Sequence, residues 1–540
     1  MCDVVKSNFD SLYPQIEKSL KSAAFIAIDS EFSGLISNSK FKRSLFDSGK
    51  ENYLKMKHGI EQFIIFQFGL SVYHFNRERN EYAADIYNFY IFPHSFGSVD
   101  HKFLCQSSSW EFLCRYNFDF NMVAYKGISY LNNQQEKIIR KEFQENSCIL
   151  NDAENLQAKK IIQEECSKIL EWCLTAKIND STYVDLNGID FRLEYFLHKE
   201  IRRRFKQVWT YSEVLKIRIV MLSEEEVSKL ETTHGRKLEE TLLRNLLGFS
   251  KIFKLLVDLK KPIIGHNCFL DFMIAYNQFY APLPTSYDVF KKNIHFLFPH
   301  VFDTKFMSYE VRRILMKEDK KVTVWPGNSL VELYEYFRDS KPLVSHIPKI
   351  IINDGIKEPA VEKRVHHACW DAYMTGFCFI YLAHFKAVEN LGRNAISRPL
   401  SRTEHLAGVA LYENCVNLMR CNIPFINFSG KDPPSNRPKS LHVRRKDLKA
   451  VDIYEITELL SSFGSVDVKS DGQGGALVAA ARNSVYFDIL WFYKGNEEFR
   501  IVPYFPLAHS RVIKSVLWSG IAISSGLVLT YLLSILRTSS

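Results

Sequence analysis

The sequence has no cysteine spacing that is typical of a disulfide framework or of a zinc site. Its 11 cysteines are an odd number in 540 residues and include no Cys-x2-Cys pair, which favours reduced thiols. Residues 1–22 also contain no basic segment followed by an apolar stretch, so we expect no secretory signal peptide. These absences predict a chain that folds without disulfide bonds.

A strong charge imbalance is absent as well. The formal net charge of +9 is a mild excess, which is compatible with a polyanionic ligand but does not identify one. A hydrophobic fraction of 46% and a charged fraction of 24% are ordinary for folded domains and exclude a predominantly disordered chain. The length of 540 residues predicts about two to four folded units.

Two carboxylates end the first apolar run of the chain. Asp29 and Glu31 follow Phe25-Ile26-Ala27-Ile28, and residues two apart in a strand point to the same side. Two anions held this close repel each other unless a cation lies between them, and a divalent metal ion is the usual solution. The alternative is a strand end with two solvated acids.

Further acids and a histidine occur far downstream. Residues 261–267 predict a short buried strand and a turn, and Asp271 lies in the helical segment that follows. A later helical segment opens with His366 and His367 and contains Asp371. Four acids and one histidine in this order indicate a functional site more specifically than any one of these segments does alone.

This set resembles the DEDDh 3′-to-5′ exonucleases and, among them, the poly(A)-specific ribonuclease family. Similar stretches are Phe-Asp-Phe-Asn at 118–121, Gly-Ile-Ser-Tyr-Leu-Asn at 127–132, Phe-Tyr-Ala-Pro-Leu-Pro at 279–284 and Phe-Asp-Thr-Lys at 302–305. The resemblance covers most of the first 400 residues. It implies an RNA phosphodiesterase with two Mg²⁺ ions, which Mn²⁺ can replace, held by Asp29, Glu31, Asp271 and Asp371.

The same resemblance implies a histidine as the general base, because its pKa lies near the working pH. The His-x4-Asp spacing favours His366, whereas His367 would share a helix face with Asp371. Asp303 is a lesser metal candidate and is better explained as structural. Phe32 follows Glu31, and its ring is expected either to stack on the terminal base or to lie in the core. By the same resemblance, Leu35, Asn267 and Lys305 are expected to contact RNA.

The expected fold is α/β, with a ribonuclease-H-like DEDD exonuclease core, a helical insertion, a degenerate RRM-like domain and a C-terminal transmembrane helix. The predicted nuclease domain is discontinuous, at 1–150 and 248–395. Residues 151–247 form an insertion that is either helical or a degenerate Arg-x3-His nucleic-acid-binding module. A helix and linker follow at 396–439, and the RRM-like domain occupies 440–507. Its central strands lack the aromatic residues that stack bases, so we expect no cap binding.

Residues 515–536 contain no charged side chain, and about 20 such residues can cross a bilayer. Arg511 and Lys514 precede this segment, and Trp518 and Tyr531 lie near its ends, as is common in membrane helices. The alternative is a buried core helix. The sequence therefore predicts a tail anchor with the enzyme in the cytosol, on the mitochondrial outer membrane or alternatively on the endoplasmic reticulum.

A nuclease with degenerate accessory domains and a C-terminal membrane anchor resembles the branch of this family that trims piRNA 3′ ends. That resemblance implies a single-stranded RNA 3′ end as substrate, carried as a precursor piRNA by a PIWI protein and presented by a Tudor-domain membrane partner. A membrane-anchored poly(A) deadenylase and a non-catalytic, membrane-tethered RNA-binding scaffold are the alternatives.

Overall fold

The computed structural model describes residues 2–36, 38–148, 152–318, 324–339, 344–353, 366–392 and 398–505. The chain divides into two compact units. The first comprises Met1–Lys42, Tyr53–Asn417 and Phe425–Lys431, and the second comprises Arg43–Asn52, Leu418–Pro424 and Asp432–Ser540.

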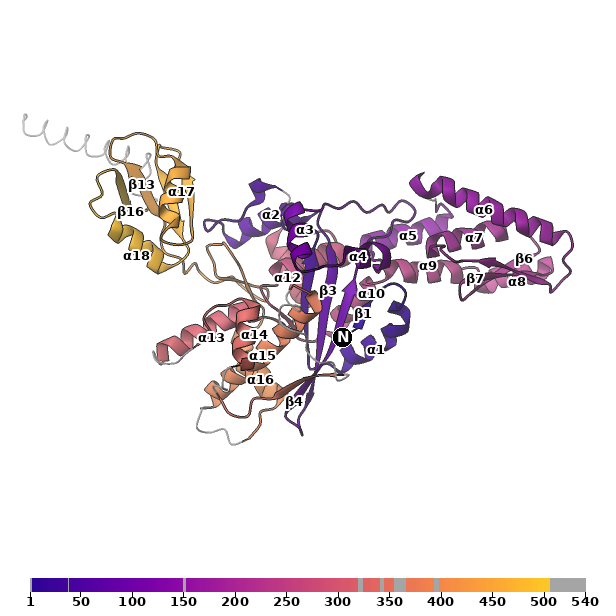
Figure 1. Cartoon of the computed structure of the whole chain (residues 1–540), viewed down its shortest axis with the longest axis horizontal. Helices are drawn as coiled ribbons and strands as arrows, with labels where there is room; N and C mark the ends of the chain where they lie inside the picture. Colours follow the sequence, from indigo (N-terminus) through magenta and orange to yellow (C-terminus); the bar gives the residue numbers. More distant parts are fainter. Residues whose placement is uncertain are drawn as a thin grey trace, which may run out of the picture. The chain divides into compact units, whose positions relative to one another are not determined.

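The first unit is built on a mixed seven-stranded sheet with the order β1-β4-β3-β2-β8-β9, in which β10 also pairs with β4 (Figure 1). Its strands are β1 (Cys2–Val4), β2 (Phe25–Phe32), β3 (Ile65–Asn76), β4 (Glu81–Tyr90), β8 (Ile263–Gly265), β9 (Val301–Asp303) and β10 (Lys349–Ile352). Strands β2, β3 and β4 are antiparallel, whereas β8 and β9 extend the sheet in parallel from β2. This sheet and its helices confirm the predicted α/β core.

Helices surround this sheet and complete the first unit. They are α1 (Phe9–Ser22), α2 (Gly49–Ile60, which begins in the second unit), α3 (Ser107–Arg115), α4 (Phe120–Lys126), α5 (Asn133–Glu145), α10 (Ser250–Leu259), α11 (Phe269–Ala275), α12 (Tyr287–Leu297), α13 (Thr304–Glu318), α14 (Leu330–Asp339), α15 (Ala368–Leu391) and α16 (Arg402–Gly408). Short helical turns are η1 (Ser39–Phe41), η2 (Tyr276–Tyr280) and η5 (Ala410–Tyr412), and β11 (Cys415–Asn417) pairs with β12 (Phe425–Asn427).

Helix α15 forms the centre of the main hydrophobic core. Its residues are apolar on nearly every face, and Trp370, Tyr373 and Phe377 are buried in the same cluster as Phe25 of β2. A helix that is apolar all round must be covered on all sides. The sequence of α15 therefore requires it to lie inside the molecule, against the sheet.

The insertion between α5 and α10 is not purely helical, so that alternative is wrong. Its elements are α6 (Asp152–Cys173), β5 (Ser181–Asp185), α7 (Phe191–Arg204), β6 (Val208–Glu213), β7 (Lys216–Met221), α8 (Glu224–His234) and α9 (Lys237–Leu247), and Figure 1 shows helices grouped around β6 and β7. The three strands form an antiparallel sheet of order β5-β7-β6. Alternating burial along β7, with Ile217 and Ile219 inside, explains the strand.

The basic run at 201–206 makes many contacts within this insertion. Arg202 stacks on Trp209, with 3.7 Å from the guanidinium carbon to the ring centroid. Arg203 and Arg204 each lie 2.7 Å from a carboxylate oxygen of Glu200. These contacts favour a structural role for the three arginines over a dedicated RNA site.

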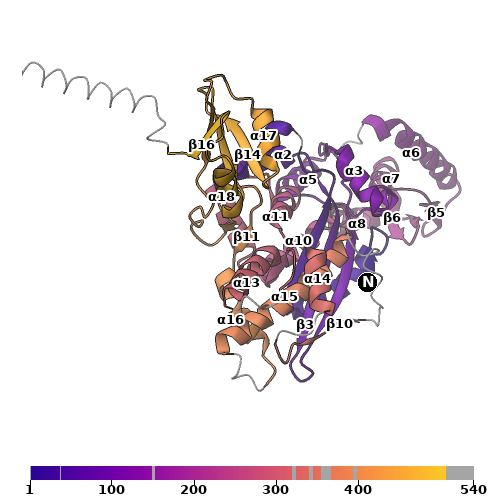
Figure 2. The same cartoon turned by 60° about the vertical axis from the view of Figure 1, so that its left-hand side comes forward.

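The second unit contains a four-stranded antiparallel sheet of order β14-β15-β13-β16, visible in Figure 2. Its elements are β13 (Leu441–Arg445), α17 (Ile453–Ser461), β14 (Val466–Ser470), β15 (Ala476–Ala480), α18 (Asn483–Phe492) and β16 (Phe499–Pro503). This β-α-β-β-α-β sequence is that of an RRM-like unit.

The strands and helices of the RRM-like fold lie at 441–503, inside the predicted 440–507, and the compact unit also includes Arg43–Asn52 and Leu418–Pro424. Segment 43–52 joins it, because the Leu45 amide donates to Asp467 at 2.7 Å and Lys469 Nζ lies 4.3 Å from the centroid of the Phe46 ring. Asp467 and Lys469 alternate with the core residues Val466 and Val468 on β14, so they point to the sheet face where an RRM stacks bases. Part of that face is occupied by the protein's own chain.

The predicted membrane segment at 515–536 lies outside the described residues. Within the described ranges, no helix is both long enough and apolar enough to cross a bilayer.

Candidate active site

Strand β2 carries the first two predicted ligands. Phe25, Ile26 and Ala27 are buried and hold the strand between β3 and β8, with Asp29 opposite Gly69 of β3. The register shifts between Glu31 and Phe32, and a shift of this kind re-aims side chains at the end of a strand.

Asp271 comes from the strand–turn–helix segment β8–α11. The turn is fixed by Asp303, whose carboxylate accepts the amides of Asn267 at 2.9 Å and Cys268 at 3.2 Å. It also accepts the amides of Lys305, Phe306 and Asn417. Asp303 is fully buried, so its carboxylate organises the backbone and supports the structural interpretation made from the sequence.

The N-terminus of α15 carries Asp371 and is held tightly on β3. The side chain of Gln67 accepts the Ala368 amide at 3.0 Å, and the Ser71 hydroxyl donates to the Cys369 carbonyl at 3.3 Å. A Cβ atom on Gly69 would lie 1.9 Å from the Ala368 carbonyl oxygen. Only glycine at this position permits so close an approach of helix and strand.

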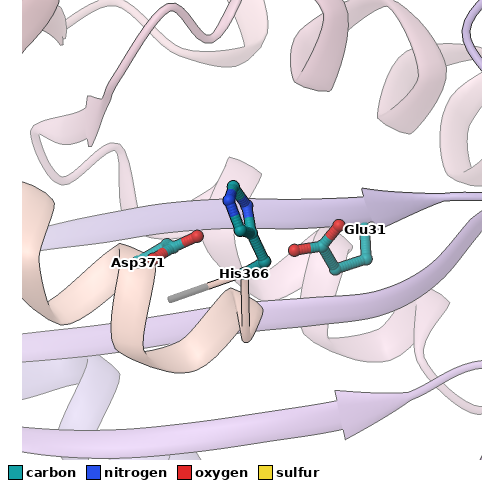
Figure 3. A group of neighbouring side chains, drawn as sticks. All are labelled: Glu31, His366 and Asp371. Atoms are coloured by element: carbon teal, nitrogen blue, oxygen red, sulfur yellow. The ribbon is translucent and has the colours of Figure 1, made fainter. Parts of the chain in front are cut away.

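These elements bring the predicted site together. Ligand atoms of Glu31, His366 and Asp371 all lie within 4.8 Å of one another, and Figure 3 shows the imidazole between the two carboxylates. Burial raises the pKa of Asp29 well above its ordinary value, and the charges of Asp371, Asp271 and Glu31 raise it further. The four predicted carboxylates therefore interact with one another, although they come from β2, α11 and α15.

The electrostatics of this cluster fit divalent cations. Burial raises the pKa of Asp271 to about 7 and that of Asp371 to about 7, because several buried anions are unfavourable without a counter-charge. One carboxylate oxygen of each of these residues is buried and has no hydrogen-bond partner in the described part of the chain. Unpartnered carboxylate oxygens are the donors that Mg²⁺ and Mn²⁺ prefer, so the residues present fit such ions.

Comparison with known proteins agrees with this chemistry. Residues 4–379 match the sequence model of the CAF1 family ribonuclease. The chain belongs to the CAF1 ribonuclease family.

Similar proteins include the pre-piRNA 3′-exonuclease trimmer of Bombyx mori, which is 36% identical over 532 residues and matched over 98% of each chain. Poly(A)-specific ribonuclease PNLDC1 of Mus musculus is 31% identical over 539 residues, covering 98% of this chain and 99% of that protein. Poly(A)-specific ribonuclease PARN of Xenopus laevis is 30% identical over 538 residues, covering 93% of this chain and 80% of that protein.

These matches confirm the predicted enzyme class: this CAF1-family chain is a 3′-to-5′ exoribonuclease of the PARN and PNLDC1 group, and its substrate is RNA. They also confirm the ribonuclease-H-like exonuclease fold. Nucleases of the CAF1 family depend on divalent metal ions, and the acidic cluster meets that requirement.

The two adjacent histidines of this CAF1-family site differ in what surrounds them. The ring of His366 lies beside Glu31 and Asp371, and burial lowers its pKa. His367 is the residue before α15, and its Nδ1 lies 3.3 Å from the Cys369 sulfur. The geometry therefore favours His366 over His367 as the group nearest the carboxylates.

The four predicted RNA contacts have different surroundings. Phe32 is partly buried beside the bulge of β2, and Leu35 is 48% exposed just beyond it. The side-chain oxygen of Asn267 accepts a hydrogen bond from Asn417 at 2.7 Å. Burial lowers the pKa of Lys305. None of these observations tests the RNA contacts, which stay predictions.

Sequence reasoning missed two groups around this CAF1-family site. Gly69 has a local signal, because an isolated glycine inside an apolar strand indicates close backbone approach. The aromatic residues Phe112 and Tyr116 have none. Their rings lie 4.5 Å and 4.2 Å from the His366 ring, centroid to centroid, and only the tertiary structure brings α3 to the histidine.

Proposed function

We propose that this enzyme is an Mg²⁺-dependent exoribonuclease that releases 5′-nucleoside monophosphates and trims the 3′ ends of precursor piRNAs. The proposed substrate rests on the match to the Bombyx mori pre-piRNA trimmer, which covers 98% of both chains. A match of this extent includes the accessory regions as well as the nuclease domain.

The chemistry proposed for the site uses the residues that the fold brings together. Two divalent cations held by Asp29, Glu31, Asp271 and Asp371 would supply Lewis-acid activation of water and stabilisation of the leaving oxygen. His366 takes a proton from the attacking water at an imidazole nitrogen, while the water oxygen bonds to the terminal phosphorus. The bond from phosphorus to the 3′ oxygen of the preceding nucleotide breaks, and that oxygen takes a proton from solvent.

A poly(A) deadenylase is the second candidate, because the relatives PNLDC1 and PARN are named poly(A)-specific ribonucleases. The same carboxylates would serve both substrates. A non-catalytic scaffold is not retained, because the chain is an exoribonuclease by family.

The proposed location is a cytosol-facing membrane, the mitochondrial outer membrane or alternatively the endoplasmic reticulum. Support comes from the uncharged segment 515–536 and from the basic residues Arg511 and Lys514 before it. In this proposal a PIWI protein carries the RNA, and a Tudor-domain protein on the same membrane presents it.

The test compares substrates of equal length: free oligo(A), free mixed-sequence RNA, and mixed-sequence RNA with its 5′ end loaded in a PIWI protein. The proposal predicts comparable shortening of the two free RNAs and a defined stop on the loaded RNA, where the PIWI protein covers the strand. Strong preference for oligo(A), with no shortening of the loaded RNA, would favour the deadenylase instead.

A further inference from the structure

The imidazole of His366, which lies beside Glu31 and Asp371, also contacts two aromatic rings. Within the described ranges, its ring contacts Phe112 at 4.5 Å with an interplanar angle of 72°, and Tyr116 at 4.2 Å with an angle of 58°. Phe112 and Tyr116 contact each other at 5.0 Å. No hydrogen bond to the His366 ring from the described side chains accompanies these contacts. In most catalytic histidines a hydrogen bond to the second ring nitrogen fixes the orientation.

We propose that Phe112 and Tyr116 are positioning residues that hold the His366 imidazole toward Glu31 and Asp371. This inference rests on the proposed role of His366 as general base. Edge-to-face contacts between rings have a preferred geometry, so two rings at different angles define one orientation of a third. His366 lies before the first residue of α15 and has a left-handed backbone conformation with φ of 59°.

Helix α3 is itself anchored to the strand end that carries the acids. The Gln106 side chain accepts the amides of Leu35 at 2.9 Å and Ile36 at 3.2 Å, and the Gln106 amide donates to the Ser33 carbonyl at 2.9 Å. On the inner side of the helix, Trp110 stacks on Phe120 at 4.2 Å. Phe112 on α3 and Tyr116 directly after its last residue therefore belong to a segment that is fixed to the residues following Glu31.

Exposure of these rings allows a second role, stacking of RNA bases. Phe112 is 38% exposed and Tyr116 is 40% exposed, and exposed aromatic residues beside a nuclease site can bind single-stranded RNA. The two roles differ in what they change. A positioning role acts on kcat through His366 alone, whereas base stacking contributes to binding and so to KM.

The experiment is a double-mutant cycle on single-stranded RNA in the full-length protein. Phe112→Ala combined with Tyr116→Ala is measured with His366 intact and again in a His366→Ala background. With His366 intact, the proposal predicts that kcat falls roughly tenfold to a hundredfold while KM changes by less than about twofold. In the His366→Ala background it predicts no further fall in kcat.

Two kinds of control variant accompany the cycle: substitutions that keep the aromatic rings, and a substitution at an exposed tyrosine elsewhere. Phe112→Tyr and Tyr116→Phe keep the rings and should restore most of the activity. Tyr125→Ala on α4, at a side chain that is 71% exposed, should match the wild type. Thermal unfolding of each variant checks that the fold is intact.

A loss that persists in the His366→Ala background, or that appears in KM, would overturn the positioning role in favour of RNA stacking. Unchanged activity of the double variant, with His366→Ala inactive, would overturn the positioning role alone. Full activity of His366→Ala would instead overturn the general-base role on which the inference rests.

Discussion

At the scale of single residues, the site brings together four buried carboxylates, and several buried negative charges are unfavourable without a counter-charge. Burial raises the pKa values of Asp29 and Glu31 as well as those of Asp271 and Asp371. The first pair could be recognised in the sequence because strand alternation alone places both side chains on one side. Asp271 and Asp371 required the family pattern, because no local rule connects residues 240 and more positions apart.

Replacing Asp271 or Asp371 with Asn should abolish metal binding and catalysis together. Each change removes a buried negative charge and one oxygen donor, so kcat should fall by about a thousandfold or more, since the metal ions contribute several kcal/mol. Thermal unfolding with and without Mn²⁺ measures the binding. The wild type should gain stability with Mn²⁺ and the variants should not. Asp258→Asn, at an exposed position on α10, is the control. A variant that keeps the Mn²⁺ response would exclude that residue from the metal site.

At the scale of elements, the site exists because α15 lies directly on β3. The sequence indicated the helical segment that contains Asp371, but the contact at Gly69 and the hydrogen bond from the Ala368 amide to Gln67 are long-range and could not be predicted. The insertion shows the opposite case. The sequence left a helical insertion and a degenerate nucleic-acid-binding module open, although the alternating residues of β7 contained a strand signal.

Gly69→Ala tests the contact between α15 and β3. The added methyl group would lie 1.9 Å from the Ala368 carbonyl oxygen, so the helix must move and carry Asp371 away from Glu31. We expect the free energy of unfolding to fall by roughly 1–3 kcal/mol and kcat to fall by more than about tenfold. Gly430→Ala is the matched control, because its nearest neighbour would lie 3.4 Å away. Equal behaviour of the two variants would contradict the proposed geometry.

A buried hydrogen-bond chain joins α15 to α16 and β4. His384 Nε2 lies 2.9 Å from the Ser345 carbonyl oxygen, so it must donate, which leaves His384 Nδ1 to accept from His405 Nε2 at 3.0 Å. His405 Nδ1 then accepts from the Tyr82 hydroxyl at 3.1 Å. Both histidines are therefore neutral in this arrangement, and each has one assigned tautomer.

Because this hydrogen-bond chain requires neutral histidines, we expect the free energy of unfolding to fall in mild acid. Burial, and after it the charge of His384, lowers the pKa of His405 to about 4, while Glu404 opposes the shift. An unfolded chain takes up the proton near the ordinary value of 6.5, so stability is greatest above that pH and falls as the pH drops toward about 4. At about pH 5 the loss from this residue is roughly 2 kcal/mol.

Urea unfolding at about pH 7.5 and about pH 5, for the wild type and for His405→Gln, measures how much of the pH-dependent loss of stability comes from His405. Gln can donate and accept hydrogen bonds but does not titrate, so the variant should lose less stability on acidification. An identical loss in both proteins would show that His405 does not titrate as described.

At the scale of the whole molecule, only part of the second compact unit could be predicted from the sequence. The RRM-like domain could be predicted from the sequence. Membership of segment 43–52 in the same unit could not, because its contacts, such as that between Leu45 and Asp467, are with residues far downstream in the sequence.

Charges placed in segment 515–536 test the proposed anchor without altering the nuclease. Val528→Arg with Leu529→Arg should release the protein from membranes, since each arginine near a bilayer centre costs about 2.5–3.5 kcal/mol. Membrane flotation of cell extracts measures this, and Val528→Ala with Leu529→Ala is the control. Hydrolysis of free RNA should be the same in both. Continued flotation of the arginine variant would contradict the anchor.

The central claim is that acids from β2, α11 and α15 form a single metal-binding pocket. Anomalous diffraction from crystals of the active protein soaked in Mn²⁺ tests it most directly. We expect anomalous peaks between the carboxylates of Asp29, Glu31, Asp271 and Asp371. Fully active crystals with no peak at these four side chains would contradict it.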